Sequence, residues 1–288
     1  MPPLRSWLFT PGNRIDRMEK AMGLGADVII LDLEDAVAYD EKESARVNIR
    51  SVLDRWRGPL AYVRINPISA DNAFSVNQGR QDLEAVVGPE LNGIVFPKAE
   101  SGTDARAIDT LIGQLEQERG VPAGTIDLMP IIETAKGLFN SLEVLTSTPR
   151  IRRVSFGAGD FTRDLNLEWT PTEVELLYAR SHITTMSRVA DREPPIDSVF
   201  ITIADLAGCE RSARHAKTLG FQGKMAIHPG QVAPINAAFS PTEDEIAWAK
   251  RLIAAFAEAE RQGLAALNFE GTMIDYPIVE KAKRILGR

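Results

Sequence analysis

Cysteine is nearly absent from the sequence, since Cys209 is the single one among 288 residues. No disulfide can therefore form within the chain, and such scarcity is typical of proteins in a reducing compartment. No signal-peptide core occurs in residues 1–12, and no apolar run approaches the roughly 20 residues that a membrane span needs. We expect a cytoplasmic protein with no membrane partner.

Positive charge and metal-binding histidines are also scarce. The net charge is −7, which argues against a nucleic-acid partner but leaves room for a local basic site that binds small anions. The three histidines show neither HxxxH nor HExxH spacing, so zinc is not expected. The sequence also lacks GxxxxGK[ST] and a complete GxGxxG, which excludes a P-loop or Rossmann site.

Short apolar runs alternate with longer amphipathic stretches, such as 40–56 and 104–119, along the chain. Continuous apolar runs such as 28–31 are typical of strands covered on both faces, as in parallel sheets. Eight strand–helix units favour a closed α/β barrel, which needs about 250 residues, over an open sheet. The predicted strands are 7–10, 26–33, 60–65, 93–97, 127–132, 153–157, 197–201 and 224–227.

The residues after the eighth predicted strand form a tail. Thr242 and Glu245 have the spacing of a capping box, which predicts a helix over 242–263. Residues 264–277 are predicted to form a loop, and 278–286 a short last helix. The sequence thus predicts a (β/α)8 TIM barrel over residues 1–240 and a C-terminal helical extension over 241–288, which packs on its own subunit or on a neighbour.

Polar residues follow the predicted strands at the end where α/β barrels carry their active sites. If the barrel closes, these side chains point toward one mouth. They are Thr10, Pro11, Gly12 and Asn13, then Asp32, Glu34 and Asp35, Arg64 and Asn66, Lys98 and Glu100, Glu133, Asp160 and His228.

Glu133 and Asp160 follow two consecutive apolar strands, which suits a shared metal ion. Mg²⁺ prefers oxygen ligands and keeps several waters, so two carboxylates leave positions open for a chelating substrate. The alternative is that each residue is a helix cap or a solvated loop residue. We predict a Mg²⁺ site at this pair. His228, directly before Pro229, is predicted to be a hydrogen-bonded turn residue instead of a base.

Arg64 lies inside an apolar strand, where an unpaired charge is very costly. Its partner could be Asp32 or Glu34, which would be a structural role, or a substrate carboxylate, which would be a functional one. The same reasoning applies to Lys98. Both cationic side chains are therefore candidates for substrate binding.

Further residues at the mouth are assigned from their position alone. Pro11 and Gly12, at the end of the first strand, are expected to contact the substrate. Asp32, Glu34 and Asp35 could surround and orient the metal ligands, cap a helix or simply be surface charge. The basic side chains of Arg5, Lys42 and Arg46 could hold phosphates or form structural ion pairs.

Eight ordered motifs span nearly the whole chain. They are RSWLFTPG (5–12), LDLEDAV (31–37), YVRINP (62–67), GIVFPKA (93–99), PIIETAKG (130–137), FGAGDF (156–161), GFQGKMAIHP (220–229) and GTMIDYP (271–277). The ordered set resembles the citrate lyase beta-subunit-like (CitE-like) family within the HpcH/HpaI aldolase superfamily. Residues 161–171, expected at the mouth, depart from the family's pattern.

The resemblance implies a Mg²⁺-dependent carbon–carbon lyase on a (β/α)8 barrel. The expected reaction is retro-Claisen or retro-aldol cleavage of a carboxylated 3-hydroxyacyl-CoA thioester, of the malyl-CoA or citramalyl-CoA type. The resemblance implies that Glu133 and Asp160 hold the metal and that Arg64 clamps a substrate carboxylate. It also implies that Asp275 enters the active site of a neighbouring subunit, as a catalytic base, in a homotrimer or hexamer.

Three other readings stay open at the level of the sequence. The chain could be a class II pyruvate aldolase that acts on free hydroxy-keto acids, a small carboxylate substrate without CoA. It could be the citryl-thioester subunit of a citrate lyase complex, with an acyl carrier protein as partner. It could also be a binding protein that senses CoA esters or dicarboxylates, although a mere binder would not need a metal pair.

Overall fold

The computed structural model describes residues 4–68 and 73–287. The chain divides into two compact units, Met1–Phe239 and Ser240–Arg288, and each has its own hydrophobic core. Within the described ranges, no helix combines the length and the apolar character that crossing a bilayer requires.

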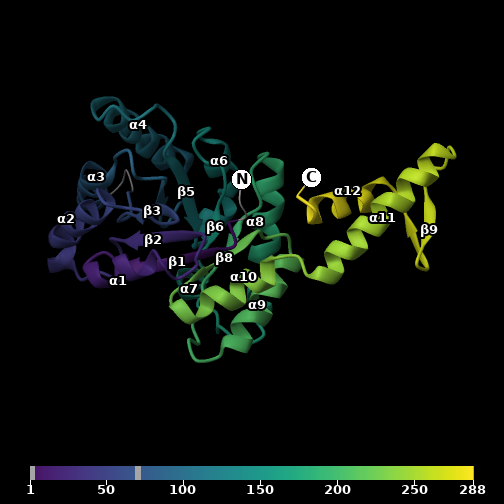
Figure 1. Ribbon diagram of the computed structural model, residues 1–288. Helices are drawn as coiled ribbons and strands as arrows, with labels where there is room; N and C mark the ends of the chain where they lie inside the picture. The colour runs from purple at the N-terminus through teal and green to yellow at the C-terminus, as the bar shows by residue number, and fades with distance from the viewer. Residues whose placement is uncertain (1–3, 69–72, 288) are drawn as a thin grey trace. The chain divides into compact units, whose positions relative to one another are not determined.

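Eight parallel strands close into a barrel in chain order, so that β1 pairs with both β2 and β8. Figure 1 shows the strands at the centre of this unit with helices around them. The closed barrel confirms the predicted (β/α)8 fold. The strands are β1 Ser6–Pro11, β2 Val28–Asp32, β3 Leu60–Arg64, β4 Gly93–Phe96, β5 Asp127–Ile132, β6 Ser155–Phe156, β7 Ile196–Asp197 and β8 Gly223–Ala226.

Both faces of the strands are buried, which explains their continuous apolar sequences. Side chains of a strand alternate between faces, so Trp7, Ile30 and Tyr62 fill the inside of the barrel. Ile29 and Val63 lie on the outer face and belong to the core beneath the helices. The inside is thus a packed core, and the open space lies at the ends of the strands.

Helices connect the consecutive strands and cover the outside of the barrel. They are α1 Ile15–Ala21, α2 Lys42–Leu53, α3 Ala73–Val86, α4 Gly102–Glu118, α5 Ala135–Phe139, α6 Ser141–Thr146, α7 Ala158–Asp164, α8 Leu177–Val189, α9 Leu206–Thr218 and α10 Val232–Phe239, with short 3₁₀ helices η1 Tyr39–Glu41, η2 Val174–Leu176 and η3 Pro229–Gln231.

The seventh strand is shorter than predicted and ends at Asp197, so the prediction of a strand over 197–201 was wrong. Ser198 Oγ accepts a hydrogen bond from the Ala158 backbone N–H at 2.8 Å. The backbone oxygen of Phe200 accepts one from Gln231 Nε2 at 2.7 Å. These side-chain contacts replace the ladder of a strand, and the residues become part of the mouth instead.

The second unit begins with the predicted capped helix, α11 Glu243–Arg261. Thr242 Oγ1 accepts a hydrogen bond from the Glu245 N–H at 3.1 Å, and Glu245 Oε2 accepts one from the Thr242 N–H at 2.8 Å. The capping box is therefore confirmed. The chain ends with α12 Tyr276–Ile285, close to the predicted 278–286.

The segment between these helices is a hairpin, so the prediction of a loop over 264–277 was wrong. Strands β9 Leu267–Phe269 and β10 Thr272–Ile274 pair antiparallel. The two residues between them, Glu270 and Gly271, have φ angles of 51° and 84°. Positive φ at both positions is what a two-residue hairpin turn needs. Glu-Gly lacks the Asn-Gly or Asp-Gly signature, which is why the sequence pattern did not indicate the turn.

Candidate active site

A cavity of about 110 Å³ lies at the mouth formed by the carboxyl ends of the strands, and we call it the central cavity. Its lining includes Phe9 and Arg64 together with Glu133, Gly157 and Asp160. These residues come from β1, β3 and the segments that follow β5 and β6. The structure thus brings Arg64, Glu133 and Asp160 to one cavity, although they are far apart in the chain.

Glu133 is held in place by its neighbours on two strands. It is 3% exposed, and its Oε1 accepts a hydrogen bond from the backbone N–H of Lys98 at 2.7 Å. Lys98 has a φ of 52°, a left-handed conformation that is uncommon outside glycine. On the other side, a Cβ built on Gly157 would lie 2.4 Å from Glu133 Oε2, so glycine leaves the space that the carboxylate occupies.

The electrostatics around Glu133 disfavour its negative charge. Burial, and then the charges of Glu34 and Asp160, raise the pKa of the Glu133 carboxyl to about 8, while Lys98 opposes the shift. Asp160, in the first turn of α7, forms an ion pair with Arg163 at 2.6 Å. The Arg163 side chain is 76% exposed, so solvent screens much of its charge.

Arg64 makes the contacts that the sequence left as the structural alternative. Its Nε and Nη2 donate to the two carboxylate oxygens of Asp32 at 2.7 and 2.6 Å, and its Nη1 pairs with Glu34 at 2.8 Å. The guanidinium also stacks on the Phe9 ring, 4.7 Å from its centroid. Burial alone would lower the pKa of Arg64, but the two carboxylates raise it above its ordinary value. The side chain is therefore charged and rigidly oriented.

Lys98 extends this network, since its Nζ pairs with Glu34. Burial raises the pKa of Glu34, and the charges of Arg64 and Lys98 oppose that shift. Asp32 Oδ1 and Oδ2 also accept hydrogen bonds from backbone N–H groups of the following turn, at 2.9 and 3.1 Å. Asp35 is exposed beside the network.

The charges around the central cavity do not balance. Four carboxylates, those of Asp32, Glu34, Glu133 and Asp160, face the cations of Arg64 and Lys98, and the largely exposed Arg163 pairs with Asp160. When all are ionised, negative charge exceeds positive charge even with Arg163 counted, which favours a bound cation. Hard oxygen donors with excess negative charge are the donor set that Mg²⁺ prefers. The residues present therefore fit a bound Mg²⁺.

The protein supplies few ligands for such an ion. Within residues 4–68 and 73–287, no group of three or more His, Cys, Asp or Glu side chains is placed to hold a metal. Mg²⁺ is often bound through one or two carboxylates and retains several waters. A substrate with adjacent oxygens would then complete the coordination at Glu133 and Asp160.

A second cavity, of about 300 Å³, lies beside the mouth at the end of β1. Pro11 lies in its wall with two basic side chains of α1, Arg17 and Lys20. Gly12 follows Pro11 in the chain, and its N–H donates to the Asp32 carbonyl at 2.9 Å. Sequence reasoning missed the two basic residues, whose spacing of three on α1 places them on one face of the helix.

Other sequence candidates have structural partners instead. Arg5 pairs with Asp27 at 2.9 Å, next to the start of β1 and away from the mouth. Lys42 Nζ donates to backbone oxygens of 33, 34 and 37, at 2.7, 2.9 and 3.3 Å. Arg46 pairs with Asp82 at 2.7 Å. His228 Nδ1 accepts from the Gly230 N–H at 3.1 Å, which makes it the predicted turn residue.

Asp275 belongs to the second unit, Ser240–Arg288. It is exposed and stands at the N-cap position of α12, yet its side chain makes no capping hydrogen bond. Its carboxylate is therefore not used by the helix that it precedes.

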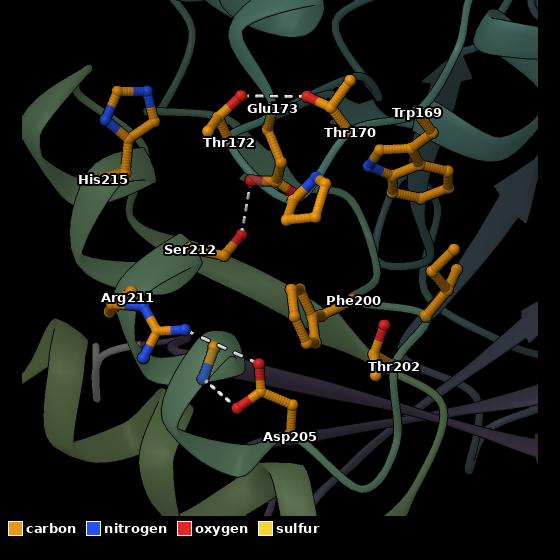
Figure 2. A pocket seen from close by; sticks show the side chains of 13 residues that line it. Trp169, Thr170, Thr172, Glu173, Phe200, Thr202, Asp205, Arg211, Ser212 and His215 are labelled. Carbon is orange, nitrogen blue, oxygen red and sulfur yellow. Dashed lines mark hydrogen bonds and ion pairs between the residues drawn. The ribbon is translucent and has the colours of Figure 1, made fainter.

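A third cavity of about 370 Å³ borders the mouth between the loops that follow α7 and β7. Figure 2 shows Trp169 and Glu173 from the first loop, Phe200 from the second, and Ser212 on α9. The sequence placed residues 161–171, and with them Trp169, at the mouth, but no motif or spacing indicated Glu173, Phe200 or Ser212. We call this space the Trp169–Phe200 cavity.

Comparisons with known proteins agree with this geometry. The family model for the HpcH/HpaI aldolase/citrate lyase family matches residues 5–229. The chain is 35% identical to the citrate lyase subunit beta of Haemophilus influenzae over 286 residues, covering 99% of this chain and 96% of that protein. It is 34% identical to a (3S)-malyl-CoA thioesterase of Cereibacter sphaeroides over 294 residues, covering 99% and 94%.

Solved structures give the same result. The structure of CitE from Mycobacterium tuberculosis, in complex with magnesium, acetoacetate and coenzyme A, matches with a TM-score of 0.78 at 30% identity. That match covers 99% of this chain and 98% of the other. The similarity therefore extends over both units of the chain.

Proposed function

The chain belongs to the HpcH/HpaI aldolase/citrate lyase family, and on this basis we propose a Mg²⁺-dependent lyase for carboxylated 3-hydroxyacyl-CoA thioesters, of the malyl-CoA or citramalyl-CoA type. The products are a keto acid and an acyl-CoA. The observation that carries the proposal is the central cavity, where Glu133 and Asp160 meet Arg64 within a network of excess negative charge. The Mycobacterium tuberculosis CitE structure, which contains magnesium and coenzyme A, supports it.

Glu133 and Asp160 would hold the Mg²⁺. The bound ion would supply Lewis-acid polarisation of the oxygen that becomes the keto group. Lys98 keeps Glu133 oriented through its backbone N–H, and Gly157 leaves room for the carboxylate. The hydrogen bond to a ligating carboxylate is of the kind that tunes metal affinity.

Arg64 binds the substrate carboxylate in this proposal. Asp32 and Glu34 fix the plane of the guanidinium, so the cation is oriented before the substrate arrives. Pre-organised charge costs no rearrangement during the reaction. Lys98, with its ammonium on Glu34, and Pro11 and Gly12, at the end of β1, would border the same ligand.

Asp275 is the proposed base, supplied by a neighbouring subunit of a homotrimer or hexamer. Its exposed carboxylate without a capping role supports this assignment. The base removes the proton of the 3-hydroxyl, and the bond between C2 and C3 breaks. The electron pair passes to the thioester as an enolate, which takes a proton at C2 to give the acyl-CoA.

The cavity beside α1 suits the CoA portion. Arg17 and Lys20 provide positive charge for phosphate groups on a protein whose net charge is −7. An acyl carrier protein in place of CoA is the alternative, favoured by the likeness to a citrate lyase subunit beta. A second alternative is a class II pyruvate aldolase that acts on free acids without CoA. The cytosolic location of the protein also stays a prediction.

One experiment tests the proposal directly. The purified protein is incubated with Mg²⁺ and malyl-CoA, citramalyl-CoA or free 4-hydroxy-2-oxo acids, and released keto acid is measured. We expect release from a CoA thioester, its loss with EDTA, and its loss in Glu133→Gln and Asp160→Asn with the fold intact by circular dichroism. Full activity in EDTA would reject the metal, and turnover of the free acids alone would favour the aldolase.

A further inference from the structure

The Trp169–Phe200 cavity is larger than the central cavity, at about 370 against 110 Å³, and the reaction as described uses none of its residues. Carbon atoms of the two aromatic rings and of the surrounding loop residues make up most of its exposed wall, and polar or charged side chains make up the rest. In Figure 2 the rings of Trp169 and Phe200 come from different loops and border the same space. An organic group of several carbon atoms fits a space of this size and lining.

The linings of the central cavity and the Trp169–Phe200 cavity are neighbours at two places. Gly159 and Val199 border the central cavity, and Phe200 follows Val199 directly in the chain. A Cβ built on Gly159 would lie 3.8 Å from Trp169 Cζ3, so the indole packs over the residue next to Asp160. A group that extends from the carboxylate pair past Gly159 therefore meets Trp169 and Phe200.

The loop that carries Trp169 is held in place by the buried carboxylate of Glu173. Glu173 is 3% exposed, and its Oε2 accepts hydrogen bonds from Arg180 Nη1 at 2.9 Å and Ser212 Oγ at 2.7 Å. Its φ of 52° is a left-handed conformation that such contacts must stabilise. The cavity is thus pre-formed, which lowers the cost of ordering it around a ligand.

The charges around the cavity compensate one another. Arg180 also binds both oxygens of Asp197, at 2.8 and 3.0 Å, and Lys224 pairs with Asp197 at 2.5 Å. Together with Glu173, this makes two buried carboxylates and two buried cations. The cavity beside α1, which carries Arg17 and Lys20, differs in this respect. Balanced charge disfavours an ionic ligand group and favours an uncharged one.

The rim of the cavity carries one more compensated pair. Arg211 lies 3.6 Å from Asp205, and Figure 2 shows the contact. Asp205 also accepts a hydrogen bond from the Gly208 N–H at 2.8 Å and so caps α9. The helix N-terminus is therefore already occupied by a carboxylate and does not attract a second anion.

We propose that the Trp169–Phe200 cavity receives the substituent on C3 of the thioester, the carbon that becomes the keto carbon, and that the preferred substrates of this type carry an uncharged substituent there larger than the hydrogen of malyl-CoA or the methyl of citramalyl-CoA. This inference rests on the proposed lyase function. When the C2–C3 bond breaks, the electron pair leaves with C2 and the substituent stays on the 2-oxo acid. In the reverse direction the same cavity selects among 2-oxo acids that condense with acetyl-CoA.

The reverse reaction provides the test. The protein, Mg²⁺ and acetyl-CoA are incubated separately with glyoxylate, pyruvate, 2-oxo-4-methylpentanoate, phenylpyruvate and oxaloacetate, and the thioester product is quantified by mass spectrometry. We expect kcat/KM for the branched or the aromatic oxo acid to exceed that for pyruvate by about tenfold or more, as a well-filled apolar pocket allows. Highest kcat/KM for glyoxylate, pyruvate or oxaloacetate overturns the inference and leaves the lyase function standing. If no oxo acid is condensed and no thioester is cleaved, both the inference and the proposed lyase function are overturned.

Variants of the cavity residues test whether this cavity determines the selectivity among oxo acids. Trp169→Ala and Phe200→Ala should each lower the ratio of kcat/KM for phenylpyruvate to that for pyruvate by about tenfold. Thr202→Phe, which fills the cavity from an exposed position, should lower the same ratio without removing any buried side chain.

Phe139→Ala is the matched control. Its ring is 87% exposed on α5, so removing it should leave the ratio unchanged. If the ratio stays at its wild-type value in Thr202→Phe and Phe200→Ala, the cavity does not hold the substituent. If Phe139→Ala lowers the ratio as much as Phe200→Ala does, the effect is not specific and the inference also fails.

Discussion

Gly157 shows how a single residue without a side chain can control a metal site. A Cβ at this position would lie 2.4 Å from Glu133 Oε2, closer than real contacts allow. We therefore expect Gly157→Ala to displace the Glu133 carboxylate and to weaken Mg²⁺ binding by roughly 10- to 100-fold, as other changes around metal ligands do. Isothermal titration calorimetry of the full chain with Mg²⁺ measures this directly.

Gly159 provides the control within the same turn. A Cβ there would have Trp169 Cζ3 as its nearest neighbour at 3.8 Å, an ordinary van der Waals contact. Gly159→Ala should bind Mg²⁺ within about threefold of the wild type, since no ligand needs to move. Equal losses in both variants would show that the helix start, and not the carboxylate, is what alanine disturbs.

Arg64 differs from a simple point charge because three of its nitrogens each contact a different carboxylate oxygen, two on Asp32 and one on Glu34. Lysine cannot bind both oxygens of Asp32 and also reach Glu34, as the guanidinium does. Arg64→Lys should therefore lower kcat/KM by about tenfold or more. Arg5→Lys, which changes a similar pair with Asp27 far from the mouth, should retain full activity. Steady-state kinetics of the two variants separate the cases, and unchanged kinetics in Arg64→Lys would make Arg64 structural.

At the scale of elements, β7, β8, α8 and the loop before α8 are joined by one buried ionic network. Asp197 on β7 pairs with Lys224 on β8 and with Arg180 on α8, and Arg180 continues to Glu173. All four side chains are buried, so removing one leaves the others uncompensated. The network explains how β7, a strand of two residues, can be held in a closed barrel.

Asp197→Asn tests this network through stability. It should lower the free energy of unfolding by about 3–5 kcal/mol, the usual cost of breaking a buried pair. Glu210→Gln, which breaks the exposed pair with Arg214 on α9, should cost about 1 kcal/mol or less. Urea titrations followed by circular dichroism give both values. Equal costs for the two variants would contradict the assigned role of the buried pair.

The effect of Asp197→Asn on the free energy of unfolding should depend on pH. Burial alone would raise the pKa of Asp197, but Lys224 and Arg180 outweigh it and hold the pKa below the ordinary value of 3.8. The stabilisation is therefore fully present above that value and is lost as pH falls through the lower folded-state pKa. The stability difference between wild type and Asp197→Asn should be constant near neutral pH and shrink below about pH 4. A difference that grew on acidification would have the wrong sign.

At the scale of the whole molecule, the proposal divides the active site between subunits, with Asp275 from one and the central cavity from another. Arg64→Lys and Asp275→Asn should then each retain about a tenth of the activity or less alone but complement one another in mixed oligomers. Random assembly of equal amounts of the two variants should restore about a quarter of the sites. Each active site needs an intact central cavity from one subunit and an intact Asp275 from its neighbour. Co-refolded or co-expressed mixtures are assayed for keto acid release.

The control is a mixture of Arg64→Lys with Glu133→Gln, which removes two residues of one cavity. No shared site can then be intact, so activity should stay at the level of the single variants. Recovery in this control, or a monomer by light scattering at assay concentration, would contradict a site shared between subunits.

The sequence by itself determined the barrel and the order of its elements. The eight apolar runs and the Thr242 capping box depend on residues near one another in the chain, so their local pattern is sufficient. Their positions in and after the strands made Glu133, Asp160 and Arg64 candidates, and the roles that the resemblance implies for them stay predictions. The hairpin at Glu270 was missed because its turn lacks the usual residues.

The tertiary structure alone decided which side chains meet. Arg64 had two carboxylates and a substrate as candidate partners, and packing paired it with Asp32 and Glu34. Trp169 and Phe200 carry no motif, and they border one cavity only because two loops converge beside the mouth. Such contacts join residues distant in the chain, and their geometry depends on how strands and helices pack, which local sequence does not encode.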